Sequence, residues 1–133
     1  MTDAALPSAY LQKARRALTG ARVLLQAGDT EGACNRAYYA MFDAAHAALI
    51  TAGVELSAAP IKTHNGLIAA FGQHLVRGQH LPADYGASFN KVQRLRQLAD
   101  YTGEPISIGD ATWALEQAQA FAHAITEKFS IGE

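Results

Sequence analysis

A stretch of polar side chains interrupts an otherwise alanine-rich, apolar segment at residues 29–52. Arg36, Tyr39, Asp43 and His46 follow one another at steps of three or four residues, a spacing that places them on one face of a helix. A guanidinium in apolar surroundings needs a carboxylate or a phosphate as its partner. The stripe therefore predicts either the lining of a cleft or dimer seam, or a set of internal structural contacts.

A second polar group lies at residues 94–101. Arg94 and Tyr101 share one helical face, and Arg96 and Asp100 are four residues apart. Taken alone, the second pair is most simply a surface ion pair, worth about 0.3–0.5 kcal/mol. Together with the first stripe, the group favours a common site, and we expect the arginines of both segments to gather around one cleft or one dimer seam.

The elements that must position these residues are helices. Turn and capping residues divide the chain into segments that begin near Ser8, Asp29, Thr63, Pro82 and Ser107. The expected ranges are 8–27, 29–52, 63–76, 82–101 and 107–128. No alternating, strand-like pattern competes with them. The sequence thus predicts an all-α, up-and-down bundle of about five helices over residues 8–129, with tails at 1–7 and 130–133.

The segment at residues 29–52 has two apolar faces, which predicts a central place in the bundle. Tyr38 and Phe42 are expected to fill core space, with the tyrosine hydroxyl bonded to a neighbour. His64 begins the third helix, where capping or loop packing is favoured over a role at an anion-binding helix end. Trp113 and His123 are interpreted as packing residues.

Composition narrows the range of functions. With 133 residues the chain is one domain, and half of its residues are hydrophobic. Eleven basic and 12 acidic residues leave a net charge of −1, so any contact with nucleic acid requires a local patch. Cys34 is the single cysteine, which excludes an internal disulfide and fits a reducing compartment.

Other sequence patterns point to a cytoplasmic protein without a metal or cofactor. No apolar run has the length of a membrane span, and residues 1–7 lack the features of a secretion signal. The metal-binding patterns HExxH and ExxH do not occur, and neither does a phosphate-binding glycine loop. We expect no membrane contact, no metal site and no cofactor.

Three motifs in order resemble the HEPN family, in its minimal single-domain prokaryotic branch. They are Asn35-Arg36-Ala37-Tyr38-Tyr39-Ala40-Met41-Phe42, Lys62-Thr63-His64-Asn65-Gly66 and Leu95-Arg96-Gln97-Leu98-Ala99-Asp100-Tyr101. The resemblance runs from about residue 10 to 129. It implies a compact bundle, commonly a homodimer whose facing helices build a shared cleft. Many relatives are metal-independent ribonucleases, often toxins neutralised by a partner such as a small nucleotidyltransferase.

The chain departs from the family's catalytic pattern. In the nucleases of the family, an arginine is followed four to six residues later by a histidine, which transfers protons near neutral pH. Here no histidine occurs between His80 and His123. Tyr101, with an ordinary pKa near 10, is a poor base at pH 7, and an ionised Asp100 has no proton to donate. The resemblance therefore implies the fold, the homodimer and an Arg/Asp/Tyr cleft able to hold a phosphate-bearing ligand.

The candidate residues follow from the motifs and the spacing together. The catalytic candidates are Arg94, Arg96, Asp100 and Tyr101. The ligand-binding candidates are Arg36, Tyr39, Asp43, Arg96, Asp100, Tyr101 and His64.

Three hypotheses stay open at this point. In the first, the chain is one component of a two-component toxin–antitoxin-like system and binds a partner protein and a nucleotide or RNA. In the second, it is an active ribonuclease with a variant site. In the third, it is a structural helical dimer without a ligand. A buried pair between Arg36 and Asp100 supports the third, whereas a cleft open to solvent supports the first two.

Overall fold

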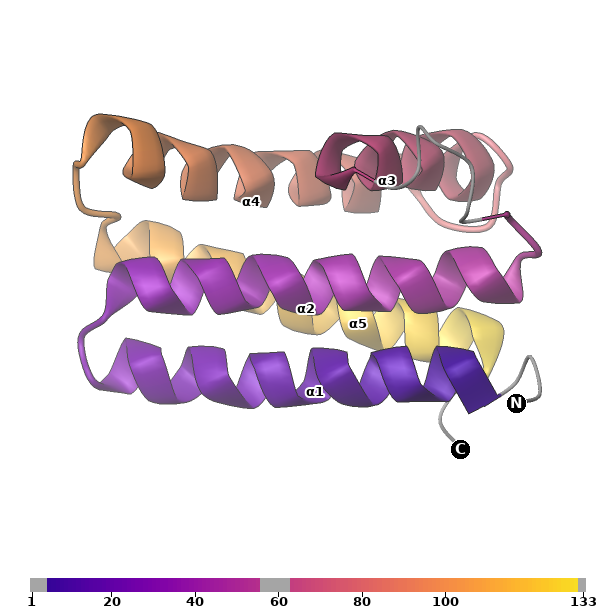
Figure 1. The fold of residues 1–133 in the computed structure, drawn as a ribbon, viewed down its shortest axis with the longest axis horizontal. Coiled ribbons are helices and arrows are strands. Elements are labelled where there is room, and N and C mark those ends of the chain that lie inside the picture. Colours follow the sequence, from indigo (N-terminus) through magenta and orange to yellow (C-terminus); the bar gives the residue numbers. More distant parts are fainter. Residues whose placement is uncertain (1–4, 56–62, 132–133) are drawn as a thin grey trace.

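The computed structural model describes residues 5–55 and 63–131, and these form a helical bundle. No strand occurs in this part of the chain, which confirms the all-α prediction. The elements are α1 (Ala5–Gln26), α2 (Thr30–Thr51), α3 (His64–Ala70), the π-helix η2 (Phe71–Val76), α4 (Ala83–Thr102) and α5 (Ile108–Phe129). In Figure 1, α1 and α2 run antiparallel beside each other, α5 lies behind them, and α4 and α3 cover the opposite side of α2.

Helix α2 is the central element of the bundle, because it contacts every other helix. Both of its predicted apolar faces are buried, apart from Phe42, which packs at the edge of the core. The fully buried residues are Ala33, Cys34, Ala37, Tyr38, Ala40, Met41, Ala44, Ala45, Ala47, Ala48 and Leu49. Because most of these side chains are single methyl groups, neighbouring helices approach α2 closely and leave little room for larger residues.

Several predicted helix ends are confirmed by their hydrogen bonds. The Asp29 carboxylate accepts a bond of 2.8 Å from the backbone N–H of Gly32, and Ser107 Oγ accepts one of 3.0 Å from Asp110. Helix α4 ends at Gly103, whose φ of 68° lies in the left-handed region that glycine adopts without strain. Local side-chain chemistry thus fixes where α2 and α5 begin and where α4 stops.

Other boundaries differ from the prediction. Helix α1 already includes Ala5, so Ser8 lies within it and does not cap it; Pro7 fits there because the first helical N–H groups need no partner within the helix. Pro82 is the residue before α4 and not its first. The third helix widens into η2 from Phe71 onward. Most of the expected tail at 1–7, together with residues 132–133, lies outside the described residues.

The close packing around α2 gives a direct test. Ala44 is fully buried, whereas Ala120 on α5 is exposed. Replacing Ala44 with leucine forces extra volume into a filled core and should lower the free energy of unfolding by about 1–3 kcal/mol. Ala120→Leu, measured beside it by urea denaturation, should change the free energy by less than about 0.5 kcal/mol. Equal effects of the two substitutions would contradict the close packing of α2.

Candidate functional site

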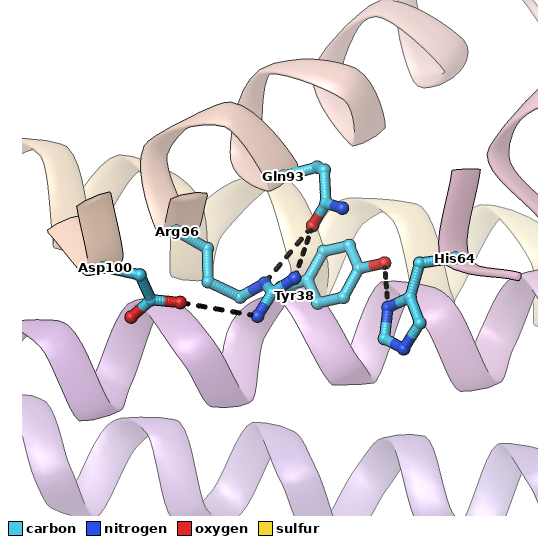
Figure 2. A network of polar contacts seen from close by, with 5 residues as sticks. All are labelled: Tyr38, His64, Gln93, Arg96 and Asp100. Carbon is cyan, nitrogen blue, oxygen red and sulfur yellow. Dashed lines mark hydrogen bonds and ion pairs between the residues drawn. The ribbon is translucent and has the colours of Figure 1, made fainter. Parts of the chain in front are cut away.

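A polar network surrounds the buried ring of Tyr38 on α2 (Figure 2). The guanidinium carbon of Arg96, on α4, lies 4.6 Å from the centroid of the Tyr38 ring. On another side, the Tyr38 hydroxyl forms a hydrogen bond of 2.8 Å with Nδ1 of His64, at the start of α3. One tyrosine therefore joins three helices, and it brings an arginine and a histidine that are 32 residues apart in sequence into one network.

The guanidinium of Arg96 is held by residues of its own helix. Its Nε and Nη2 donate hydrogen bonds of 3.2 and 3.1 Å to Oε1 of Gln93, which is buried. Its Nη1 lies 3.8 Å from Oδ2 of Asp100, whose side chain is 71% exposed. The predicted ion pair is thus confirmed, and its exposure makes it weak. Sequence reasoning missed Gln93, although its position three residues before Arg96 was a usable signal.

The hydrogen bond between Tyr38 and His64 joins two groups whose pKa values favour their neutral forms. Burial raises the pKa of the Tyr38 phenol, so its hydroxyl keeps its proton. Burial, and then the charge of Arg96, lower the pKa of His64, which favours the neutral imidazole. The hydroxyl donates to Nδ1 when Nε2 carries the proton of the neutral ring, and it accepts from Nδ1 in the other tautomer.

A pocket of about 450 Å³ lies between α1 and α2, next to this network. Its lining residues are Lys13, Arg16, Ala17, Arg36, Tyr39, Phe42 and Asp43. The sequence predicted Arg36, Tyr39 and Asp43 on one face, and the structure places all three on this pocket. The sequence analysis did not identify Lys13 and Arg16, because the packing of α1 against α2 is what brings them to the stripe. Their separation of three residues on the first helix was the available signal.

Tyr39 lies between the two groups of residues. It lines the pocket with Arg36, and the centroid of its ring is 5.9 Å from the guanidinium carbon of Arg96. Arg36 and Arg96 thus share a neighbour. Arg36 is exposed and Asp100 pairs with Arg96, so the structure contains no buried pair between Arg36 and Asp100 in the described residues.

Two catalytic candidates lie apart from the network in the single chain. Arg94 is exposed, and the Tyr101 side chain is 85% exposed. Counting about 100° per residue, they point roughly 160° and 140° away from Arg96 around α4. The predicted clustering of all the arginines with Asp100 and Tyr101 is therefore not present within one protomer. Their meeting at a dimer seam remains a prediction.

The remaining histidine and tryptophan predictions have mixed outcomes. The cap of α3 is Thr63, so His64 packs against Tyr38 and does not cap the helix. His46 does not line the pocket with the other residues of the polar stripe. Its ring stacks on that of Tyr10, with centroids 4.7 Å apart. Trp113 packs against the core as expected. The prediction that His123 is a packing residue was wrong. Its side chain is 74% exposed, and its Nε2 lies 3.8 Å from Oε1 of Glu127.

The described residues contain neither a candidate metal site nor a helix that could span a membrane. No three histidine, cysteine or acidic side chains gather there in a way that could hold a metal ion. None of the helices described has both the length and the apolar character that crossing a bilayer demands. Burial raises the pKa of the Cys34 thiol to about 11, which removes it as a nucleophile near neutral pH.

Comparison with known proteins gives a consistent result. The family model described as the HEPN domain matches residues 8–128. A UPF0332 protein of Gloeobacter violaceus is 37% identical over 93 residues, which are 70% of each chain. A protein of Methanocaldococcus jannaschii named "Putative toxin MJ0605" is 31% identical over 88% of this chain and 84% of its own length. A UPF0332 protein of Thermotoga maritima is 30% identical over 87% of this chain and 85% of its own length.

The two half-buried histidines predict how stability depends on pH. Burial lowers the pKa of His46 and of His64 in the folded chain, whereas both have ordinary values near 6.5 when unfolded. Below about pH 6.5 the unfolded chain therefore binds more protons, and the free energy of unfolding should fall. His46→Phe keeps the ring contact with Tyr10 and should reduce this fall between pH 7.5 and 5.5. Parallel curves for the variant and the parent in urea denaturation would contradict the assignment.

Proposed function

This chain belongs to the HEPN domain family, and we propose that it is one component of a two-component toxin–antitoxin-like system in the cytoplasm. In this role it binds a partner protein, for which a small nucleotidyltransferase is the best candidate, and a phosphate-bearing ligand such as RNA. The name of the Methanocaldococcus jannaschii relative supports the toxin role. Its similarity extends over most of both chains, so it concerns this whole domain.

The observation that carries the ligand-binding part is the setting of Arg96. Its guanidinium lies over the Tyr38 ring and is fixed along one edge by the buried Gln93. Among the described residues, its Nη1 has one acidic partner, the exposed carboxylate of Asp100, at the long distance of 3.8 Å. An arginine held over an aromatic ring in this way can contact a phosphate through Nη1, and the weak ion pair is easily exchanged for that contact.

The homodimer is part of the same proposal. Leu98, Tyr101 and Ile108 are large apolar side chains at neighbouring ends of α4 and α5, and they are 57%, 85% and 70% exposed. A second copy that covered them would bury this apolar surface. It would also bring Arg94 and Tyr101 to a seam, where they would complete the Arg/Asp/Tyr cleft that a single protomer lacks.

A ribonuclease is the second candidate, because Tyr38 contacts both Arg96 and His64, which come from different helices. We infer that the Tyr38 hydroxyl donates to Nδ1, which argues against proton abstraction. In this arrangement Nδ1 is occupied and Nε2 carries the hydrogen, so the neutral ring has no free nitrogen to accept a proton from a ribose hydroxyl. The site is therefore better suited to holding a phosphate than to cleaving its ester. The third candidate, a structural dimer without a ligand, is weakened by the exposure of Arg36.

Growth of a bacterial host tests the toxin–antitoxin role. Expression of this chain alone should slow growth, and co-expression of the proposed nucleotidyltransferase partner should restore growth. Arg96→Ala should relieve the effect, because it removes the proposed phosphate contact. Arg77→Ala removes an equally charged but exposed residue after η2 and should not. Unchanged toxicity of Arg96→Ala at equal protein levels would contradict the role given to Arg96.

A metal-free RNA cleavage assay separates the binding protein from the enzyme. We expect no rapid cleavage of structured or unstructured RNA, because the loss of a proton-transfer group typically costs about 10²–10⁴-fold in rate. The variants to compare are Arg96→Ala, Tyr101→Phe and His64→Asn. Rapid cleavage that any one of them abolishes would establish the ribonuclease in place of the binding protein. Cleavage that survives all three would identify a contaminating nuclease.

A further inference from the structure

Helix α1 carries an uneven share of the positive charge of this chain. Four of the 11 basic residues, Lys13, Arg15, Arg16 and Arg22, lie on it, and it contains no aspartate or glutamate. All four residues are exposed. The whole chain has a net charge of −1, so this helix is a basic surface on a slightly acidic molecule. Such a surface attracts partners of the opposite charge.

Two of these arginines border a groove of about 290 Å³ between α1 and α5. The α1 side of the groove is formed, at steps of three and four residues, by Arg15, Leu18 and Arg22. The α5 side is formed, on one helical face, by Gln119, Ala122, His123 and Thr126. Two rows of side chains at helical spacing form the kind of groove into which a further helix packs.

The groove lies on a side of the bundle that the described helices leave open. In residues 5–55 and 63–131, α1 contacts α2 and α5 and no other helix, and α3 and α4 lie on the opposite side of α2 (Figure 1). The groove is also separate from the seam proposed for the homodimer. Ile108 in that seam and Gln119 in the groove are 11 residues apart, which is about 16 Å along α5. A homodimer and a further partner can therefore be bound together.

Arg22 is oriented at the groove by a neutral group. With the side-chain oxygen of Gln119 turned toward the guanidinium, Oε1 accepts hydrogen bonds of 2.9 Å from Nε and 3.2 Å from Nη2 of Arg22. The amide leaves the charge of Arg22 uncompensated, and in the described part of the chain neither Arg15 nor Arg22 takes part in an ion pair. Nη1 of Arg22 is not used by Gln119, so it can donate to a carboxylate from outside.

The groove fits a helix of another protein better than a nucleic acid. Single-stranded nucleic acids are held largely by aromatic rings on which their bases stack, and no phenylalanine, tyrosine or tryptophan of the described residues lines this groove. Its floor is formed by Leu18 and Ala122, which suit an aliphatic side chain. Arg15 and Arg22 are seven residues apart, about 10 Å along α1. Two glutamates at the same spacing on a docked helix therefore meet both arginines.

We propose that the α1–α5 groove is the docking surface for an acidic, amphipathic helix of a partner protein. Arg15 and Arg22 bind two carboxylates of that helix, and Gln119 holds the guanidinium of Arg22 in place. Leu18 and Ala122 contact an apolar side chain that lies between the two acids. The proposal rests on the partner-binding part of the proposed function, and it adds where the partner docks and which side chains it presents.

Fluorescence anisotropy with a designed peptide tests the groove directly. The probe is an alanine-based helical peptide of about 18 residues, with two glutamates seven residues apart and a leucine midway between them. It should bind the protein, and more weakly as the salt concentration rises. A peptide of the same composition with its two glutamates on opposite faces should bind at least about fivefold more weakly. No binding of the matched peptide at millimolar concentration, or equal binding of the two peptides, would overturn the proposal.

Adjacent arginines on α1 provide a matched control. Arg15→Ala and Arg22→Ala should each weaken binding of the matched peptide about 5- to 10-fold, because each removes a charge-assisted contact. Arg16→Ala removes the same charge from a residue that lines the pocket on the α2 side of α1, and it should weaken binding less than about threefold at physiological salt. Equal losses in Arg15→Ala and Arg16→Ala would reduce the effect to net charge and overturn the site.

Charge reversal separates direct contact from damage to the fold. The double variant Arg15→Glu/Arg22→Glu should lose the glutamate peptide and bind a counterpart in which lysines replace both glutamates. Both positions are exposed, so the bundle should remain folded, which heat denaturation checks. Gln119→Glu should weaken the glutamate peptide about as much as Arg22→Ala does, because the new carboxylate pairs with Arg22. A folded double variant that fails to bind the lysine peptide would overturn the proposal.

Growth of a bacterial host distinguishes a failure of this docking surface from a failure of the proposed function. The charge-reversed variant should still slow growth, but the proposed nucleotidyltransferase partner should no longer restore it. Full rescue of that variant would overturn the docking surface. A parent chain that does not slow growth would contradict the toxin role alone, and the peptide titration would still decide on the groove. Binding of oligouridylate in place of the peptide, lost in Arg15→Ala and Arg22→Ala, would identify a nucleic-acid surface and overturn the proposal.

Discussion

The buried phenol of Tyr38 is the constraint on which the arrangement of this molecule depends. A hydroxyl with no access to water must find a partner, and His64 supplies it at 2.8 Å. The face of the same ring receives the guanidinium of Arg96. Helix α2 is in this way joined to the start of α3 and to the middle of α4. The network links an arginine and a histidine through the tyrosine that lies between them (Figure 2).

The alanines of α2 explain why the functional candidates gather along its edge. Because α2 is buried on both apolar faces, Arg36, Tyr39 and Asp43 lie on the strip of its surface that the core leaves uncovered. Arg36 and Asp43 emerge on the side of α1, and Tyr39 lies between them and Arg96. The strip therefore borders two neighbouring regions that differ in geometry. The first is an open basic pocket, and the second is an arginine fixed on an aromatic ring.

The fold could be predicted from the sequence because its signals are local. The caps at Asp29 and Ser107 and the end at Gly103 are formed by residues within one turn of each helix terminus. The start of α1 before Ser8 was missed, because proline is equally acceptable at several positions of a first turn. The π-helical turn from Phe71 was also missed, since it depends on how the segment packs against its neighbours.

The site could be predicted only in part, because only some of its contacts are local in the sequence. Arg36, Tyr39 and Asp43 share a face of one helix, so their spacing was sufficient to group them. The spacing of Lys13 and Arg16 places them on one face of α1, but their place at the pocket depends on the packing of that face against α2, which is not a local signal. The bond between Tyr38 and His64 likewise spans 26 residues.

The central claim is that Tyr38 holds His64 as a neutral ring with its proton on Nε2, in a site that binds phosphate esters and does not cleave them. The most direct measurement is the ¹⁵N NMR spectrum of the His64 ring at pH 7. The account predicts a protonated Nε2 and an unprotonated Nδ1 with the shift of a hydrogen-bond acceptor, which is lost in Tyr38→Phe. An imidazolium, or a ring with its proton on Nδ1 and a free Nε2, would contradict the account, because either form could take part in proton transfer to or from RNA.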